Sequence, residues 1–223
     1  MRTTTSSTKR IFFAIFISLN LEFKSNKYLV TTEALYQELD DVNHSRDKRL
    51  YYANVVLENP GLIPKLLDIL FMVDDKRSSK AAWVLEYLCD INLEAIIPYL
   101  DVFTEHLHKV HLDSAQRPVA KVCENLAKAY YGKGTSKLKQ ALLPKHKEKI
   151  IEACFDWMLN DAKVAPKAYS MNTLFLLGSE YHWIHPELIG VLERDFHMQS
   201  CGYKARAETY FEAVEKQIIT LKP

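Results

Sequence analysis

The feature that most restricts the fold is an amphipathic helix pair that recurs along the chain. In one copy, the apolar residues of the first helix are spaced as i, i+3, i+4 and i+7: Ile63, Leu66, Leu67 and Leu70. An acidic turn follows, and the second helix repeats the spacing: Ala81, Val84, Leu85 and Leu88. Because one such pair cannot bury its own apolar stripe, successive pairs must stack on one another.

Similar stripes continue in both directions. First helices are predicted by four further sets: Leu35, Leu39 and Val42; Ile96, Tyr99, Leu100 and Phe103; Ile151, Cys154, Phe155 and Met158; and Leu188, Val191 and Leu192. Second helices are predicted by another four: Leu50, Ala53 and Leu57; Val119, Val122, Cys123 and Leu126; Ala168, Met171 and Phe175; and Ala207, Tyr210, Phe211 and Val214. The Gly-containing insertion at 132–136 predicts a loop. Residues 31–218 are therefore expected to form an all-α array of about five helix pairs.

The order of residues within one copy resembles the HEAT repeat of armadillo-like proteins. Ile63-Pro64 places a proline early in the first helix, Asp74-Asp75 marks the turn, and Lys80-Ala81-Ala82 opens the alanine-rich part of the second helix. This resemblance implies a right-handed α-solenoid, in which the second helices line the concave side.

Residues 1–30 are expected to lie outside this array. Lys9-Arg10 precedes a short apolar run, Ile11–Leu19, which resembles a secretory signal. The run is shorter than the roughly 20 residues that a membrane-spanning helix needs, and no small-x-small cleavage pattern follows it. We favour an extension upstream of a natural start near Val30, with a signal or membrane anchor as the alternative.

Charge and cysteine content narrow the functional classes. The 29 Lys and Arg residues nearly balance 28 Asp and Glu residues, which gives a net charge of +1. Proteins that grip nucleic acid usually have a larger basic excess. The four cysteines form no Cys-x-x-Cys pair and lie in or beside apolar helical segments: Cys89, Cys123, Cys154 and Cys201. Free buried thiols, no cofactor and no zinc site, in a reducing cytoplasm, are the prediction.

A basic residue precedes the stripe of nearly every second helix. These residues are Arg49, Lys80, Lys167 and Arg206, whereas the remaining copy has Pro118 there and Arg117 one place earlier. On a concave face they would form a basic ladder that attracts an acidic protein partner. With two neighbouring aromatic residues, the predicted partner-binding set is Arg49, Lys80, Trp83, Arg117, Lys167, Tyr169 and Arg206. Alternatively, these cations neutralise the Asp-rich turns of the preceding copies, at Asp74-Asp75, Asp113 and Asp161.

Other candidate chemistry is sparse. His106, His108, His111 and Asp113 are close in sequence, but they match no metal-binding motif, and solvated histidines near a helix end are the favoured interpretation. Trp83 and Tyr87 are four residues apart, and the favoured interpretation is that they fill a seam between repeats rather than stack on a ligand. Stacking should also bring together several polar residues at turn–helix junctions: Ser78, Ser79, Lys80, His111, Asp113, Ser114, Arg117 and Tyr169.

Three functional hypotheses follow, and the first is favoured. It is a non-catalytic protein-interaction scaffold that binds through its concave face. The second is a nucleic-acid-binding protein, because size and helical repeats resemble HEAT-like DNA alkylation-repair proteins. The third is a lyase, because Thr31-Thr32-Glu33-Ala34-Leu35-Tyr36 and Asp74–Ser79 resemble short bacterial-type helical chains labelled adenylosuccinate lyase, over about residues 31–215. The loop of true lyases reads Ser-Ser-x-Met-Pro-x-Lys-x-Asn-Pro, whereas Ser78-Ser79 is followed here by Lys80-Ala81-Ala82.

Overall fold

The structure is a computed structural model that describes residues 31–133, 137–160 and 162–221, with side chains as far as Val214. The predicted N-terminal extension, residues 1–30, lies outside the described residues. The described residues form eleven α-helices and several short 3-10 segments, and they contain no β-strand. The all-α prediction is therefore confirmed.

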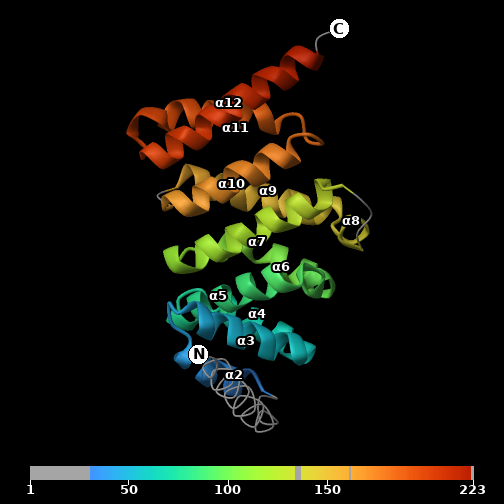
Figure 1. The fold of residues 1–223 in the computed structure, drawn as a ribbon, viewed down its shortest axis with the longest axis vertical. Helices are drawn as coiled ribbons and strands as arrows, with labels where there is room; N and C mark the ends of the chain where they lie inside the picture. The colour runs from blue at the N-terminus through green and yellow to red at the C-terminus, as the bar shows by residue number, and fades with distance from the viewer. Residues whose placement is uncertain (1–30, 134–136, 161, 222–223) are drawn as a thin grey trace, which may run out of the picture.

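The helices follow one another along the long axis of the molecule (Figure 1). The helices that occupy the places of the predicted first helices are α2 (Thr32–Glu38), α4 (Ile63–Leu70), α6 (Leu100–Glu105), α9 (Pro144–Leu159) and α11 (Ile184–Asp195). Those in second place are α3 (Arg46–Glu58), α5 (Lys76–Ile91), α7 (Asp113–Tyr131), α10 (Val164–Leu177) and α12 (Cys201–Leu221). In the second set, α5 packs between α3 and α7, and α10 packs between α7 and α12. We call these five neighbouring helices the second-helix row.

Burial confirms the central part of the predicted apolar pattern. The two stripes that define the repeat are fully inside the protein: Ile63, Leu66, Leu67, Leu70, Ala81, Val84, Leu85 and Leu88. In α7 the predicted stripe is also buried: Val119, Val122, Cys123 and Leu126. These residues belong to one continuous hydrophobic core that runs through the stacked helices. The apolar spacing alone therefore locates α4, α5 and α7 and the faces that they bury.

The prediction is wrong in detail at α3. Leu50, expected in the core, is 37% exposed, whereas Tyr52, Val55 and Val56 are buried beside Ala53. The first turns of α3 contain few apolar residues, so the sequence allows more than one choice of buried face. The predicted stripe left out the three residues that are buried beside Ala53. Tyr52 still reaches polar partners, because its hydroxyl donates to Glu38 or Asp41, each at 3.2 Å.

Two connections also differ from expectation. The segment predicted as a helix from Ile96 is a 3-10 helix over Leu93–Tyr99, and the α-helix α6 begins only at Leu100. Pro98 contributes to this break because it has no N–H to donate inside a helix. A short extra helix, α8 (Lys137–Ala141), follows the predicted loop, of which residues 134–136 lie outside the described part of the chain.

The cysteines are free thiols, but only three of them are buried: Cys89, Cys123 and Cys154. Cys201, also expected to be buried, is exposed at the start of α12. Among the helices that the structure describes, none is both long enough and apolar enough to cross a bilayer.

Candidate functional site

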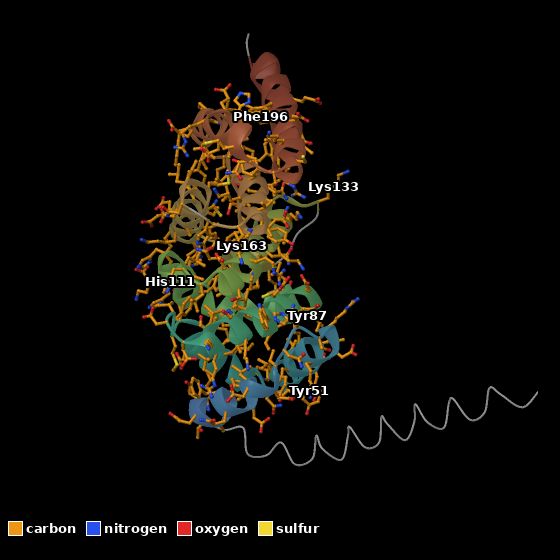
Figure 2. The ribbon with its side chains drawn as sticks, turned by 90° about the vertical axis from the view of Figure 1, so that its left-hand side faces the viewer. Tyr51, Tyr87, His111, Lys133, Lys163 and Phe196 are labelled. Atoms are coloured by element: carbon orange, nitrogen blue, oxygen red, sulfur yellow. The ribbon has the colours of Figure 1, made fainter. Side chains whose placement is uncertain are left out.

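The second-helix row forms one side of the molecule (Figure 2). Figure 2 shows Tyr51 of α3 and Tyr87 of α5 projecting from the same side of the stack, whereas His111, in the turn before α7, lies on the opposite side. Lys163, just before α10, lies between these two sides, at the edge where the second helices begin. This edge and the adjoining face of α5 and α7 contain the candidate site.

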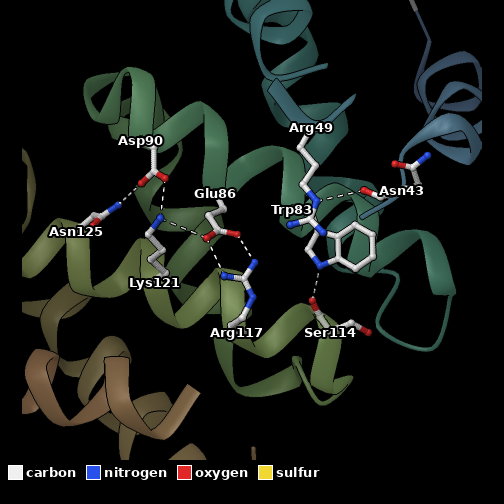
Figure 3. A network of polar contacts seen from close by, with 9 residues as sticks. All are labelled: Asn43, Arg49, Trp83, Glu86, Asp90, Ser114, Arg117, Lys121 and Asn125. Atoms are coloured by element: carbon white, nitrogen blue, oxygen red, sulfur yellow. Dashed lines mark hydrogen bonds and ion pairs between the residues drawn. The ribbon is translucent and has the colours of Figure 1, made fainter. Parts of the chain in front are cut away.

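A charged network joins α5 to α7 (Figure 3). The Arg117 guanidinium donates two hydrogen bonds to the two carboxylate oxygens of Glu86, at 2.9 and 2.5 Å. The Lys121 ammonium lies 3.3 Å from Glu86 and 2.6 Å from Asp90. Asn125 completes the network by donating its amide N–H to Asp90 at 2.9 Å. Acids on one helix thus face cations on the next, and every member of the network has a partner.

The network lies in the contact between α5 and α7, which we call the seam, and its shared acid is buried. The Glu86 side chain is only 4% exposed, whereas Arg117 and Lys121 are 31% and 25% exposed. Partial burial opposes the charged form of Arg117, but the hydrogen bonds and charge of Glu86 outweigh it and raise the pKa of Arg117. The pKa of Lys121 is raised in the same way, against partial burial, by Asp90 and Glu86. A proton is therefore held firmly on both cations.

Trp83 fills the next position towards the start of α5. Its indole N–H donates to the carbonyl of Ser114 in α7, at 2.8 Å. That carbonyl is four residues before Pro118, which has no N–H and so cannot supply the usual helical hydrogen bond. Trp83 thus provides the donor that the proline lacks, and its side chain is only 9% exposed.

Arg49 of α3 lies on the other side of Trp83. Its guanidinium carbon is 4.5 Å from the centre of the indole ring, in the geometry of a cation–π contact. Its Nε–H donates to the backbone carbonyl of Asn43 at 3.2 Å. The ring of His44 also lies beside the indole, 5.0 Å away between ring centres. In the described part of the chain, no carboxylate forms an ion pair with Arg49.

A cavity of about 400 Å³ opens among these groups. It lies near the starts of α3, α7 and α10, beside the part of α5 that runs between α3 and α7. Its walls consist of His44, Arg49, Trp83, Glu86, Tyr87, Asp113, Ser114, Arg117, Lys163, Ala165 and Pro166. We call it the Trp83 cavity. Its size is within the range of small-ligand pockets, and it combines apolar walls with a few charged groups.

The other residues of the predicted partner-binding set are scattered. Lys80 does not enter the cavity, because its ammonium donates to the Asp40 carbonyl at 2.8 Å and lies 3.5 Å from the Asp40 carboxylate. Lys167 is 6% exposed. Tyr169 lies close enough to Arg117 to contribute to its raised pKa. Burial raises the pKa of Tyr210 in α12, and the nearby charge of exposed Arg206 opposes part of that rise.

Two members of the predicted basic ladder, Lys80 and Arg117, are therefore already paired with acids. Arg49, Trp83 and Arg117 come together at the Trp83 cavity, whereas Lys80 is paired with Asp40, which is not one of the turn aspartates that the alternative interpretation named. Asp40 belongs to the turn that follows α2, and it also receives Arg77. Further along, Lys163, which precedes α10 and is not a member of the predicted ladder, lies 3.1 Å from Asp113 at the start of α7.

The remaining candidates have local partners. Half-buried His106 bonds to the carbonyl of Val102, and exposed His111 lies 3.2 Å from Asp74. Within the described residues, no group of three or more His, Cys, Asp or Glu side chains could hold a metal ion. Of the predicted set of junction residues, Ser79 and Ser114 do meet, and the hydroxyl of Ser79 donates to that of Ser114 at 3.1 Å.

Sequence reasoning missed the acidic half of the site. Glu86 and Asp90 are four residues apart on α5, and Arg117 and Lys121 are four residues apart on α7. Residues at this spacing share one helix face, so two acids and two bases on neighbouring second helices were a readable signal. Comparisons of this chain with protein-family models, with curated proteins and with solved structures find no match.

Proposed function

We propose that the chain is a HEAT-like, right-handed α-solenoid that acts as a non-catalytic scaffold and binds a protein partner through the face of its second-helix row. The contacts of α4 with α5, of α9 with α10 and of α11 with α12, in helices that succeed one another along one axis, support the solenoid interpretation (Figure 1). A row of parallel helices offers a long continuous surface, which repeat proteins commonly use for binding.

The observation that carries this proposal is the contrast between the network and the Trp83 cavity. Glu86, Asp90, Arg117 and Lys121 neutralise one another, so they form a fixed wall rather than a set of groups ready to transfer protons. Next to this wall, the cavity is open and contains a cation, Arg49, that has aromatic contact but no acidic partner among the described residues. A rigid wall beside an unneutralised cation suits recognition better than catalysis.

The two alternatives have less support. For nucleic-acid binding, the predicted basic ladder would need free cations, but Lys80 and Arg117 are already paired with Asp40 and Glu86. For a lyase, the serine pair would need mobility, but Ser78 is 1% exposed inside α5. Its hydroxyl donates to the Leu70 carbonyl, at 2.5 Å. A serine held in this way cannot swing to take a proton from a substrate.

Site-specific photocrosslinking tests the proposed binding face. A photoreactive residue replaces Tyr87, which lines the Trp83 cavity, and a matched control carries it at Val102, which is 46% exposed on α6. In cells of the native host, the Tyr87 position should yield a discrete protein adduct that disappears when unmodified protein is present in excess. An adduct with nucleic acid, or one formed only at Val102, would contradict the proposal.

A further inference from the structure

The charges that line the Trp83 cavity do not balance. Three cations, Arg49, Arg117 and Lys163, line it together with two carboxylates, Glu86 and Asp113. Glu86 is paired with Arg117, and Asp113 is paired with Lys163 at 3.1 Å. The surplus of one positive charge therefore belongs to Arg49, whose Nε–H is used but whose two terminal nitrogens have no partner within the described residues.

The position of Arg49 is fixed before any ligand arrives. The contact with the Trp83 ring and the hydrogen bond to the Asn43 carbonyl hold the guanidinium at the cavity wall. The outer nitrogens of a guanidinium form a planar fork that matches the two oxygens of a carboxylate. Because the side chain is already ordered, binding an anion there costs less conformational entropy than it would at a free surface arginine.

The rest of the cavity wall gives the ligand an apolar flank and a second source of positive potential. Tyr87, Ala165 and Pro166 contribute apolar surface beside Trp83. Helices α7 and α10 both begin at the cavity, and neither has a side-chain cap on its first N–H groups. The positive ends of these two helix dipoles add to the field of Arg49. The cavity volume of about 400 Å³ is enough for one or two amino-acid side chains.

We infer that the Trp83 cavity binds the side-chain carboxylate of an acidic residue in a peptide segment of the partner, with an apolar neighbour of that residue against Tyr87 and Pro166. This inference rests on the proposed function and names the chemistry that the scaffold recognises. One surplus charge matches one carboxylate. A phosphate, with a charge of about −1.5 to −2, would face the Glu86 and Asp113 carboxylates with more negative charge than Arg49 can neutralise.

Titration by NMR spectroscopy tests the inference on the whole chain. The probes are acetylated, amidated pentapeptides of sequence Ala-Phe-Glu-Ala-Ala and Ala-Phe-Gln-Ala-Ala, and the observed signals are the indole N–H of Trp83 and the Nε–H of Arg49. The Glu peptide should shift both signals saturably, with a Kd of about 1 mM or tighter, as one clamped carboxylate can supply. The Gln peptide should bind at least about tenfold more weakly, a loss of about 1.4 kcal/mol.

Two variants separate the cavity from general charge attraction. Arg49→Gln should weaken Glu-peptide binding about tenfold or more, whereas Arg46→Gln should leave it unchanged, because Arg46 is exposed on the same helix but does not line the cavity. Equal binding of the two peptides, unchanged binding by Arg49→Gln, or tighter binding of a phosphoserine peptide would overturn the inference. Photocrosslinking at Tyr87 that persists undiminished in Arg49→Gln would overturn it while leaving the scaffold proposal intact.

Discussion

Two arginines have opposite surroundings in the second-helix row. One lies in the seam between α5 and α7, and the other lies where α3 meets α5, which we call the rim. At the seam, Arg117 meets a buried glutamate, Glu86, and becomes part of the wall. At the rim, Arg49 meets the face of Trp83 and keeps its charge without an acidic partner in the described residues. Both arginines occupy similar places at the start of their second helices. The residue that faces each of them from α5 decides whether it is neutralised or available.

Only three positions on α5 separate these two outcomes. Trp83 and Glu86 are nearly one helical turn apart, so they lie on almost the same face of α5, about 4.5 Å apart along its axis. Glu86 neutralises the charge of Arg117 in α7. Trp83 instead holds the side chain of Arg49 in α3 in place without cancelling its charge. Both contacts fix an arginine, but only one of them leaves a site for an anion.

The largest expected effect comes from removing the acid at the seam. Glu86→Ala leaves the Arg117 and Lys121 charges partly buried without their shared partner, which should lower the free energy of unfolding by about 3 kcal/mol. Arg49→Gln should lower it by less than about 1 kcal/mol, because it loses only a cation–π contact and one hydrogen bond. Urea unfolding at pH 7 measures both values.

A glutamate at the surface provides the control for this comparison. Glu152 pairs with Lys149 on α9, and both side chains are well exposed, so Glu152→Ala should change the free energy of unfolding by no more than about 0.5 kcal/mol. If Glu86→Ala cost no more than Glu152→Ala, the seam would not depend on its charged network. The distinction between a neutralised seam and an available rim would then fail.

An intermediate effect is expected at the indole hydrogen bond. Trp83→Phe removes the donor to the Ser114 carbonyl and should cost about 1–3 kcal/mol, because Pro118 supplies no replacement. Pro118→Ala restores a backbone N–H that can reach this carbonyl. The two substitutions together should therefore cost less than the sum of the two alone, by about 1 kcal/mol.

A double-mutant cycle of urea unfolding experiments measures this coupling. It also cancels the loss of ring volume that each substitution causes by itself. Strict additivity would show that the proline and the tryptophan are energetically independent. Trp83 would then stabilise the rim through packing alone.

The helices could be predicted from sequence where apolar residues are dense enough to define a single stripe. Leu66, Leu67 and Leu70 in α4, or Val84, Leu85 and Leu88 in α5, leave no second choice of buried face. In α3 the apolar residues are fewer, and Leu50 was chosen over Tyr52, whose phenol ring packs inside while its hydroxyl reaches carboxylates. The 3-10 segment before α6 depends on Pro98 and on its contacts with α5, which a periodic pattern does not report.

The site was harder to predict because its contacts cross between helix pairs. The spacing of basic residues picked out Arg49 and Arg117, which both line the Trp83 cavity, but it did not reveal which acids lie near them. The distances of 31 residues from Glu86 to Arg117 and from Asp90 to Lys121 depend on the connection through α6, whose form the sequence did not define. Lys80 likewise reaches back 40 residues to Asp40. Neutralisation is thus a property of the stacked pairs rather than of one repeat.

The smallest expected effect on stability is at Asp40, an exposed carboxylate that forms ion pairs with Arg77 and Lys80. The hydrogen bond from Arg77, with smaller contributions from Lys80, holds the pKa of the Asp40 carboxyl below its ordinary value.

A carboxyl whose pKa is lowered by folding stabilises the protein fully above the pKa of the unfolded state, about 3.9, and this stabilisation is lost as the pH falls through the folded-state pKa. Asp40→Asn should therefore lower the Tm slightly at pH 7, by less than Glu86→Ala does, and the difference from wild type should diminish as the pH falls below about 3.9 and through the folded-state pKa of Asp40. Thermal unfolding followed by circular dichroism between these pH values measures it, with Asp68→Asn as the control, because Asp68 is exposed on α4 and forms no ion pair in the described residues. A Tm difference that persisted unchanged at low pH would mean that Asp40 acts through its uncharged contacts, so that Lys80 would not be neutralised in the way Arg117 is.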